Sequence, residues 1–305
     1  MTFTVSLDTQ VDTPLAVDFA TADGSGTTAD NDYSSSTGTL NFTGTAGETQ
    51  TFNVSANGDA KVELDETFLV NLSNLNASGR AVTIPDSQGE GSITNDDAAT
   101  LSVNDVVVAE GDSGTSTLTF TVSLDTQVDT PLAVDFATAD GSGTTADNDY
   151  SSSTGTLNFT GTAGETQTFN VSANGDAKVE LDETFLVNLS NLNASGRAVT
   201  IPDSQGEGSI TNDDAATLSV NDVVVAEGDS GTSTLTFTVS LDTQVDTPLV
   251  VDFATADGSG TTSDNDYSSS TGTLNFTGAA GETQTFNVSA NGDAKVELDE
   301  TFLVN

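Results

Sequence analysis

The sequence predicts an all-β chain of tandem antiparallel sandwiches joined end to end in a rod. Three observations lead to this prediction. The chain repeats itself with a period of 117 residues, apolar and polar residues alternate within each repeat, and turn-forming residues separate the alternating runs. No long window keeps the periodicity of an amphipathic helix.

The repeat is visible in LTFTVSLDTQ, which begins at Leu118 and returns at Leu235, while Met1 occupies the same place in the first copy. The second and third copies differ at three shared positions, where Ala133, Ala146 and Thr162 become Val250, Ser263 and Ala279. Each unit is large enough to bury its own core. We therefore expect three domains: 1–97 without its first strand, 98–214 complete, and 215–305 without its last strand.

Seven strands are expected in the complete repeat. In chain order, A to G, they span about 100–110, 116–125, 131–139, 154–160, 165–173, 183–191 and 205–212. The strongest alternation is in strand B, where Leu118, Phe120, Val122 and Leu124 are separated by threonine and serine. Strands C to F repeat this pattern in turn, at Leu132, Val134 and Phe136, at Leu157 and Phe159, at Phe169 and Val171, and at Phe185, Val187 and Leu189.

Turn residues divide these runs, as at Asp140-Gly141 and Asn174-Gly175, so a seven-stranded antiparallel sandwich is the predicted fold. Only residues 213–216 separate strand G from the next strand A, without glycine, proline or a serine-rich spacer. This short link predicts a stiff rod rather than a flexible string. At ~3.4 Å per strand residue, each sandwich should add a few tens of Å.

The composition excludes several classes of partner and site. Five Lys and Arg stand against 47 Asp and Glu, a net charge of −42, which disfavours nucleic acid and anionic lipid. Without Cys or His, disulfides and thiolate or imidazole metal sites are excluded. We find no signal peptide and no apolar run that would insert in a membrane, and we expect the chain to be cut from a longer array.

Strand parity predicts where the acids meet. In an antiparallel sandwich the ends of A, C, E and G lie at one pole, and G leads directly into the next domain. The acids at these ends are Glu110, Asp140, Asp176, Glu180, Asp213 and Asp214. With only Lys178 nearby, their repulsion favours a bound hard cation, and an all-oxygen site suits Ca²⁺, with Asn212 and backbone carbonyls completing the shell.

Alternatives to a cation site remain open. Each acid taken alone could serve as a turn cap or as solvated charge, and the overall acidity could reflect solubility or adaptation to salt. Asp147 and Asp149 resemble a D-x-D pair, but they lie in the middle of the C–D loop, where we expect them to shape a turn.

Several segments resemble the Calx-beta domain, the module of the calcium-sensing loop in sodium/calcium exchangers. They are AEGDSGTSTLTFTVSL, FATADGSGTTADNDYSSSTGTLNFTGTAGETQTFNV, NGDAKVELDETFLVNLSN and GSITNDD, which together span 98–214. The resemblance implies an immunoglobulin-like sandwich with Ca²⁺ at its distal loops. The ligands that it implies are Glu110, Asp140, Asp176, Glu180, Glu183, Asp213 and Asp214 in the second copy, Asp23, Asp59, Glu63, Asp96 and Asp97 in the first, and Glu227, Asp257, Asp293 and Glu297 in the third.

Two departures from the family pattern indicate fewer and weaker ion sites. Asn174-Gly175-Asp176 replaces an uninterrupted acidic run, and Asn212-Asp213-Asp214 replaces three aspartates. We therefore expect one or two ions per junction, with a millimolar affinity that would suit a structural role.

These features predict an extracellular spacer, filament or adhesin stalk of bacterial origin, stiffened by Ca²⁺, whose partners are neighbouring repeats and identical chains in a filament. The alternative is a calcium-sensing or ligand-binding module whose interdomain angle responds to Ca²⁺. We expect no enzymatic activity, because paired carboxylates are the only catalytic chemistry available and a neighbouring repeat covers them.

Overall fold

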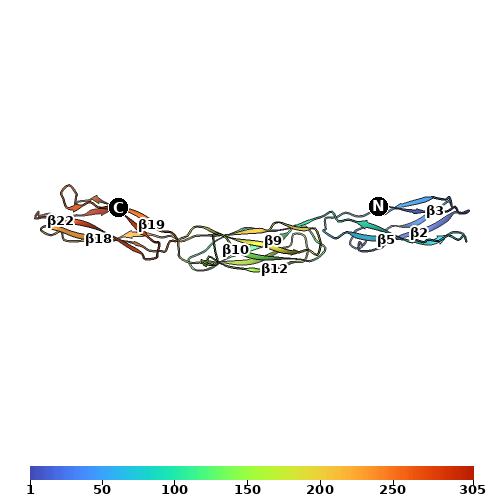
Figure 1. The fold of residues 1–305 in the computed structure, drawn as a ribbon, viewed down its shortest axis with the longest axis horizontal. Helices are drawn as coiled ribbons and strands as arrows, with labels where there is room; N and C mark the ends of the chain where they lie inside the picture. The colour runs from blue at the N-terminus through green and yellow to red at the C-terminus, as the bar shows by residue number, and fades with distance from the viewer.

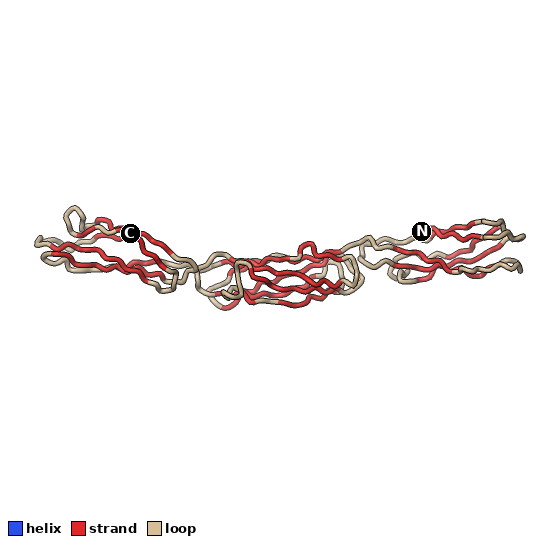
Figure 2. The backbone as a smooth tube through the Cα atoms, viewed as in Figure 1, coloured by secondary structure: helices blue, strands red, loops and turns tan.

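The three repeats form separate sandwiches that follow one another along a rod. The computed structural model describes all residues 1–305, and it contains strands but no helix. Strands run along the rod and loops collect at the two poles of each sandwich (Figures 1 and 2). No helix that is long and apolar enough to span a bilayer is present.

The second repeat is the complete unit, and its ten strands form two five-stranded sheets. One sheet has the order β12-β10-β14-β16-β8, and the other has the order β11-β13-β9-β7-β15. The strand bounds are β7 (Ala99–Val103), β8 (Val106–Ala109), β9 (Gly114–Leu124), β10 (Leu132–Asp140), β11 (Tyr150–Ser151), β12 (Thr154–Phe159), β13 (Thr166–Gly175), β14 (Glu183–Asn193), β15 (Val199–Asp203) and β16 (Gln205–Thr211).

The flanking repeats contain most of the same strands, but the first has none equivalent to β11 or β15 and the third has none equivalent to β8. In the first repeat these are β1 (Thr2–Ser6), β2 (Leu15–Asp23), β3 (Thr37–Phe42), β4 (Thr49–Asn53), β5 (Glu66–Asn76) and β6 (Gln88–Ile93). In the third repeat they are β17 (Leu218–Val220), β18 (Gly231–Leu241), β19 (Leu249–Asp257), β20 (Tyr267–Ser268), β21 (Thr271–Phe276), β22 (Thr283–Gly292) and β23 (Phe302–Val304).

The alternation read from the sequence places one face of each strand in the core. On β9, the side chains of Leu118, Phe120, Val122 and Leu124 are completely buried between the two sheets. Aromatic rings stack across this core, with the Phe136 and Phe169 ring centroids 3.9 Å apart. The expected tandem sandwich fold is therefore confirmed, and each repeat encloses its own apolar cluster.

The first predicted strand is divided between the two sheets. β7 pairs antiparallel with β9, whereas β8 pairs parallel with β16 in the opposite sheet. The chain crosses at Asn104 and Asp105, where the Thr121 N–H donates to Asn104 Oδ1 at 2.6 Å and the Glu207 N–H donates to Asp105 Oδ1 at 2.8 Å. These two side chains accept hydrogen bonds from backbone N–H groups of β9 and β16, one in each sheet. The expectation of a single continuous strand was therefore wrong.

A strand that was not predicted completes the second sheet. β15 pairs parallel with β7 along the edge of the sandwich. No strand is predicted for these residues, which lie between the expected strands F and G. Together with the β8–β16 pair, it makes two parallel pairings in a sandwich that was expected to be wholly antiparallel.

A backbone bridge joins each repeat to the next. The Val62 N–H donates to the Gln127 carbonyl at 2.9 Å, and the Asp129 N–H donates to the Val62 carbonyl at 3.1 Å. The second junction repeats the bridge through Val179, with hydrogen bonds to Gln244 at 2.9 Å and from Asp246 at 3.1 Å. Both bridges are parallel β-pairings between domains, so the junction is held by more than its short covalent link.

Burial of the bridging valine follows the presence of the neighbouring repeat. Val62 has 0% of its surface exposed and belongs to the core cluster of the second repeat. Val179 is partly buried against the third repeat, and Val296, which has no repeat after it, is fully exposed. Val62 and Val179, which both bridge to a following repeat, are therefore more buried than Val296.

Candidate metal centre at the repeat junction

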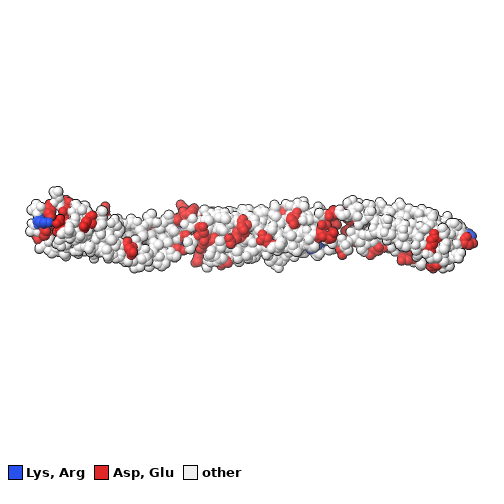
Figure 3. All heavy atoms as spheres, turned by 90° about the horizontal axis from the view of Figure 1, so that it is seen from above, with Lys and Arg blue, Asp and Glu red and all other residues white.

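Two groups of three carboxylates lie at the pole of the second repeat that faces the third. The first acidic group contains Glu110, Asp213 and Asp214, and the second contains Asp149, Glu180 and Glu183. Within each group, one oxygen from every residue lies within 4.8 Å of the others. Acidic side chains gather in the same way around both junctions of the rod (Figure 3).

Glu110 is the most enclosed member of the first acidic group. It follows β8, and only 5% of its surface is exposed. Its Oε1 atom is buried without a hydrogen-bond partner, as is Oδ2 of Asp214. A buried carboxylate oxygen without a donor is costly, so both atoms are available to a cation and have no other stabilising partner.

The end of β13 packs closely against the backbone of the first acidic group. A Cβ atom added to Gly175 would lie 2.0 Å from the Gly111 carbonyl oxygen and 2.7 Å from that of Glu110. Only glycine permits this approach. The glycine that interrupts the acidic run of the family pattern therefore has a steric reason in this chain.

Asn212 connects the two acidic groups. Its Oδ1 accepts from the Glu180 N–H at 3.0 Å, and its Nδ2 donates to the Asp214 carbonyl at 2.9 Å. Asp213 is fixed separately, because its Oδ1 accepts from the Gly111 N–H at 3.1 Å. Asn212 therefore positions the carboxylates of both groups, whereas the sequence suggested it as a ligand.

Burial and mutual repulsion raise the pKa of the crowded carboxyls. Burial, together with the charges of Glu180, Asp176 and the aspartate pair, raises the pKa of Glu110 to about 7. Burial, with the hydrogen bond and charge of Asp149, raises that of Glu183 to about 8. Lys178, which is ion-paired with Glu180, opposes the shift at Glu183. The pole therefore has an excess of negative charge, which a divalent cation would relieve.

Asp149 is the residue that the sequence reasoning missed. It shapes its loop as expected, because the Thr144 N–H donates to its Oδ2 at 2.6 Å. Only 7% of its surface is exposed, and it lies within the second acidic group. The signal was the adjacent Tyr150, whose short strand β11 pairs with β13 and draws the loop over the pole.

Asp140 and Asp176 take different positions from the other predicted residues. Asp140 belongs to neither group: its Oδ1 accepts from the Tyr150 hydroxyl at 2.7 Å and the Thr145 N–H at 3.1 Å, and these bonds lower its pKa. Asp176 also lies outside both groups, but its charge raises the pKa of Glu110 and Asp214. It therefore stands at the edge of the first acidic group.

The first repeat contains only the second acidic group, as Asp32, Glu63 and Glu66. A hollow of about 300 Å³ nevertheless gathers the predicted residues of its pole, namely Asp59, Glu63, Asp96 and Asp97. Asp23 lies outside the group and accepts from the Tyr33 hydroxyl at 2.7 Å, as Asp140 does in the second repeat.

The third repeat also contains the second acidic group, as Asp266, Glu297 and Glu300. Asp257 accepts from Tyr267 at 2.7 Å and lies apart from that group. Asp293 accepts from the Lys295 N–H at 2.6 Å, and the charge of Glu227 contributes to a raised pKa at Glu300. Glu227 and Asp293 therefore remain beside the group rather than within it.

The chain is similar to known proteins of one family. The family model of the Calx-beta domain matches residues 1–97, 93–222 and 209–305. The apo form of the Calx CBD1 domain matches with 22% identity over 39% of this chain and 100% of that one, at a TM-score of 0.33. CBD12 from CALX1.2 matches with 17% identity over 68% of this chain and 93% of that one, at a TM-score of 0.33.

The calcium binding domain CBD12 of CALX1.1 matches with 18% identity over 68% of this chain and 92% of that one, at a TM-score of 0.30. Among curated proteins, none matches the chain. The family matches together cover the whole sequence, and the three of them follow the repeats. The chain therefore belongs to the Calx-beta domain family, of which it carries tandem copies.

Proposed function

We propose that this protein is a spacer in which Ca²⁺ stiffens a rod of tandem sandwiches. The main support is that the loop between β13 and β14 contributes both to the candidate ion site and to the bridge to the next repeat. Val179 makes the bridge, and Glu180, the next residue, belongs to the second acidic group. An ion that fixes Glu180 would also fix the backbone that holds the neighbouring domain.

The donor set supports Ca²⁺ as that ion. All candidate ligands are oxygens, and the two orphaned buried atoms of Glu110 and Asp214 offer unused acceptor capacity. Flexible coordination by six to eight oxygens is typical of Ca²⁺, whereas Mg²⁺ requires a tighter octahedron. The residues that would hold the ion are Glu110, Asp213 and Asp214, together with Asp149, Glu180 and Glu183. Asp176 would add negative charge beside the ion. In the first and third repeats, the acids at the same pole would contribute charge in the same way.

The repetitive sequence favours a structural role over a specific active centre. Apart from Met1, the copies differ at three shared positions only, so no repeat carries a residue set of its own. Both acidic groups lie at the pole of the sandwich that carries the bridge to the next domain. We therefore propose an extracellular stalk or filament segment of a bacterial surface protein, without catalytic activity, in which neighbouring repeats are the partners.

Small-angle scattering of the full chain tests this proposal. Millimolar Ca²⁺ should increase the maximum dimension and narrow the distribution of interdomain angles, relative to the chain in chelator. The matched control is the double variant Glu180→Gln and Glu63→Gln, which removes one carboxylate at each of the two junctions between repeats. This variant should not respond to Ca²⁺. An identical distribution of shapes with and without Ca²⁺ would contradict the proposal.

A calcium-sensing module is the second candidate, because an ion beside the bridge could also switch the interdomain angle. Calorimetric titration of the full chain separates the two functions. A spacer needs only the high-micromolar to millimolar affinity of extracellular modules, whereas a sensor needs a dissociation constant near 10⁻⁶ M.

A further inference from the structure

A carboxylate fills a nest of backbone N–H groups at the pole of the second repeat that faces the first. Glu165 accepts from the N–H groups of Thr160 at 2.8 Å, Gly161 at 3.1 Å and Thr162 at 3.3 Å. The Thr160 hydroxyl at 2.8 Å and the Gln167 side-chain amide at 3.2 Å also donate to it. Successive N–H groups that point to one place form an anion-binding nest, and here the protein supplies the anion itself.

The nest favours the charged form of Glu165. Burial opposes ionisation, but the hydrogen bonds from the backbone and hydroxyl of Thr160 outweigh it and lower the pKa of Glu165. Hydrogen bonds to an ionised acceptor are roughly twice as strong as neutral ones. A glutamine side chain has one acceptor oxygen and would turn an NH₂ group toward the other N–H donors, so it cannot replace the carboxylate in this nest.

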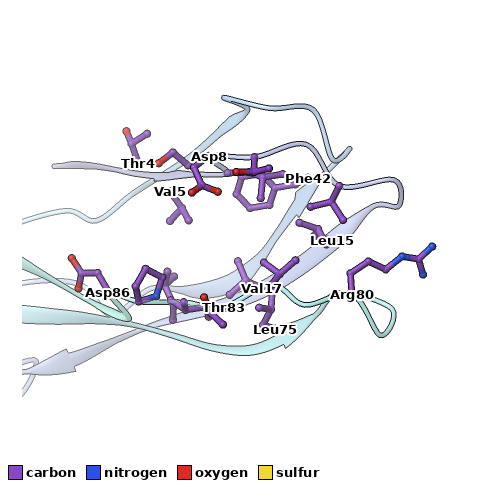
Figure 4. A pocket seen from close by; sticks show the side chains of 18 of the residues that line it. Thr4, Val5, Asp8, Leu15, Val17, Phe42, Leu75, Arg80, Thr83 and Asp86 are labelled. Atoms are coloured by element: carbon purple, nitrogen blue, oxygen red, sulfur yellow. The ribbon is translucent and has the colours of Figure 1, made fainter.

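The residue before the nest turn anchors it in the core. Phe159 ends β12, and only 1% of its surface is exposed. In the first repeat its counterpart Phe42 lies in the apolar interior with Leu15 (Figure 4). The turn that follows Phe42 holds the same nest, because Glu48 accepts from the Thr43 N–H at 2.8 Å.

Gly161 connects the nest to the neighbouring loop, residues 127–130. Its N–H group donates to Glu165, and its carbonyl accepts from the Val128 N–H at 2.9 Å. A Cβ atom on Gly161 would lie 2.4 Å from the Val128 carbonyl oxygen and 2.8 Å from that of Thr130. The φ of Gly161 is +94°, which also favours glycine. The nest turn and this loop are therefore in direct contact.

The same loop receives the preceding repeat. The Gln127 carbonyl accepts from the Val62 N–H, and the Asp129 N–H donates to the Val62 carbonyl. Val128, between these two residues, is 3% exposed and belongs with Val62 to the core cluster of the second repeat. A continuous series of hydrogen bonds and close contacts thus leads from Glu165 to Val62.

The second junction has the same arrangement in the third repeat. Glu282 accepts from the Thr277 N–H at 2.7 Å and the Gly278 N–H at 3.2 Å. The Val245 N–H donates to the Gly278 carbonyl at 2.9 Å, and the residues on either side of Val245 make the bridge to Val179.

We propose that Glu165 and Glu282 are positioning residues that shape the loop on which the preceding repeat docks. Each carboxylate fixes the nest turn, and the turn holds the receiving loop in the conformation that pairs with the bridging valine. No residue of the acidic groups takes part. The junction therefore has a determinant of its geometry that acts with or without Ca²⁺.

Spin labels can measure each junction separately, because the chain contains no cysteine. Ser35, Ser152 and Ser269 occupy the same place in the three repeats, and all are exposed. Labels on Ser35→Cys and Ser152→Cys report the distance distribution across the first junction. Labels on Ser152→Cys and Ser269→Cys report it across the second. All measurements are made in chelator, so that the result does not depend on the proposed role of Ca²⁺.

Glu165→Gln should broaden the distribution across the first junction and leave the second unchanged. We expect the undocked population to rise about 10-fold, because charge-assisted hydrogen bonds are lost. Glu282→Gln should have the reverse effect, so each variant is the control for the other. An unchanged first junction in Glu165→Gln, or equal broadening at both junctions, would overturn the proposal.

A milder variant guards against loss of the fold. Thr160→Val keeps the volume of the side chain but removes the hydroxyl that donates to Glu165, and it should broaden the first junction less than Glu165→Gln does. Circular dichroism shows whether the second repeat of Glu165→Gln remains folded. If it does not, Thr160→Val decides, and an unchanged first junction in that variant would refute the role of the nest.

Discussion

Val62 of the first repeat and Asp129 of the second are joined by a backbone hydrogen bond of 3.1 Å across the domain junction. Asp129 in turn is ion-paired with Arg197 at 2.7 Å, and the charge of Glu63 adds to the raised pKa of Arg197. One strand-like contact thus connects the acidic loop of one domain, which contains Glu63, to the ion pair of the next.

Truncating the bridging valine should loosen the first junction. Val62→Ala removes two buried methyl groups, each worth about 0.8 kcal/mol before any cavity cost. We expect a loss of roughly 2 kcal/mol from the coupling between the repeats, measured as lower stability in denaturant and as broader interdomain angles in scattering. Val296→Ala is the control, because that valine is fully exposed, and an equal loss in both variants would contradict the account.

Adding one methyl group at the end of β13 should disrupt the first acidic group. Gly175→Ala places a Cβ against two carbonyl oxygens, and overpacking of this kind typically costs about 1–3 kcal/mol. We expect lower thermal stability and weaker Ca²⁺ binding. Gly58→Ala is the matched control, since a Cβ there meets no atom within 4 Å; destabilisation of both variants to the same degree would refute the steric argument.

Removing the charge of Glu110 should stabilise the calcium-free chain but weaken its binding of Ca²⁺. Glu110→Gln keeps the shape of the side chain but relieves its repulsion from Asp213 and Asp214, so the calcium-free chain should become more stable. The same change should weaken Ca²⁺ binding at least 10-fold in a calorimetric titration. Asp140→Asn, which lies outside both acidic groups, should change the affinity far less.

The pH dependence of the calcium-free chain follows from the raised pKa of Glu110. The folded chain holds a proton on this carboxyl up to about pH 7, whereas the unfolded chain releases it near 4.5. Between these values the folded state binds more protons, so stability should fall as pH rises. One pKa unit corresponds to about 1.4 kcal/mol.

Calorimetry of the chain in chelator between pH 4.5 and 7.5 should show this decline, at about 4–8 °C per kcal/mol for domains of this size. Saturating Ca²⁺ should reverse the trend, because the ion binds the deprotonated carboxylates. Glu110→Gln should flatten the calcium-free profile, and an unchanged slope in that variant would assign the effect to other groups.

The sequence by itself determined the all-β class, the repeat and most strand positions, because period-two alternation directly reports which side chains face a core. Strand parity also placed Glu110, Glu180, Asp213 and Asp214 at one pole, since chain direction alternates whatever the packing. In the structure these four lie in two acidic groups, which do not include Asp140 and Asp176. Their role as Ca²⁺ ligands stays a prediction.

Only the tertiary structure decided the features that depend on non-local contacts. The division of the first strand between two sheets depends on partners far along the chain, at Thr121 and Glu207. Asp149 joins the site because the Tyr150 strand folds back onto β13, and Asp140 leaves it because the Tyr150 hydroxyl binds it. The valine bridge exists only where a second domain docks, so no pattern within one repeat could reveal it.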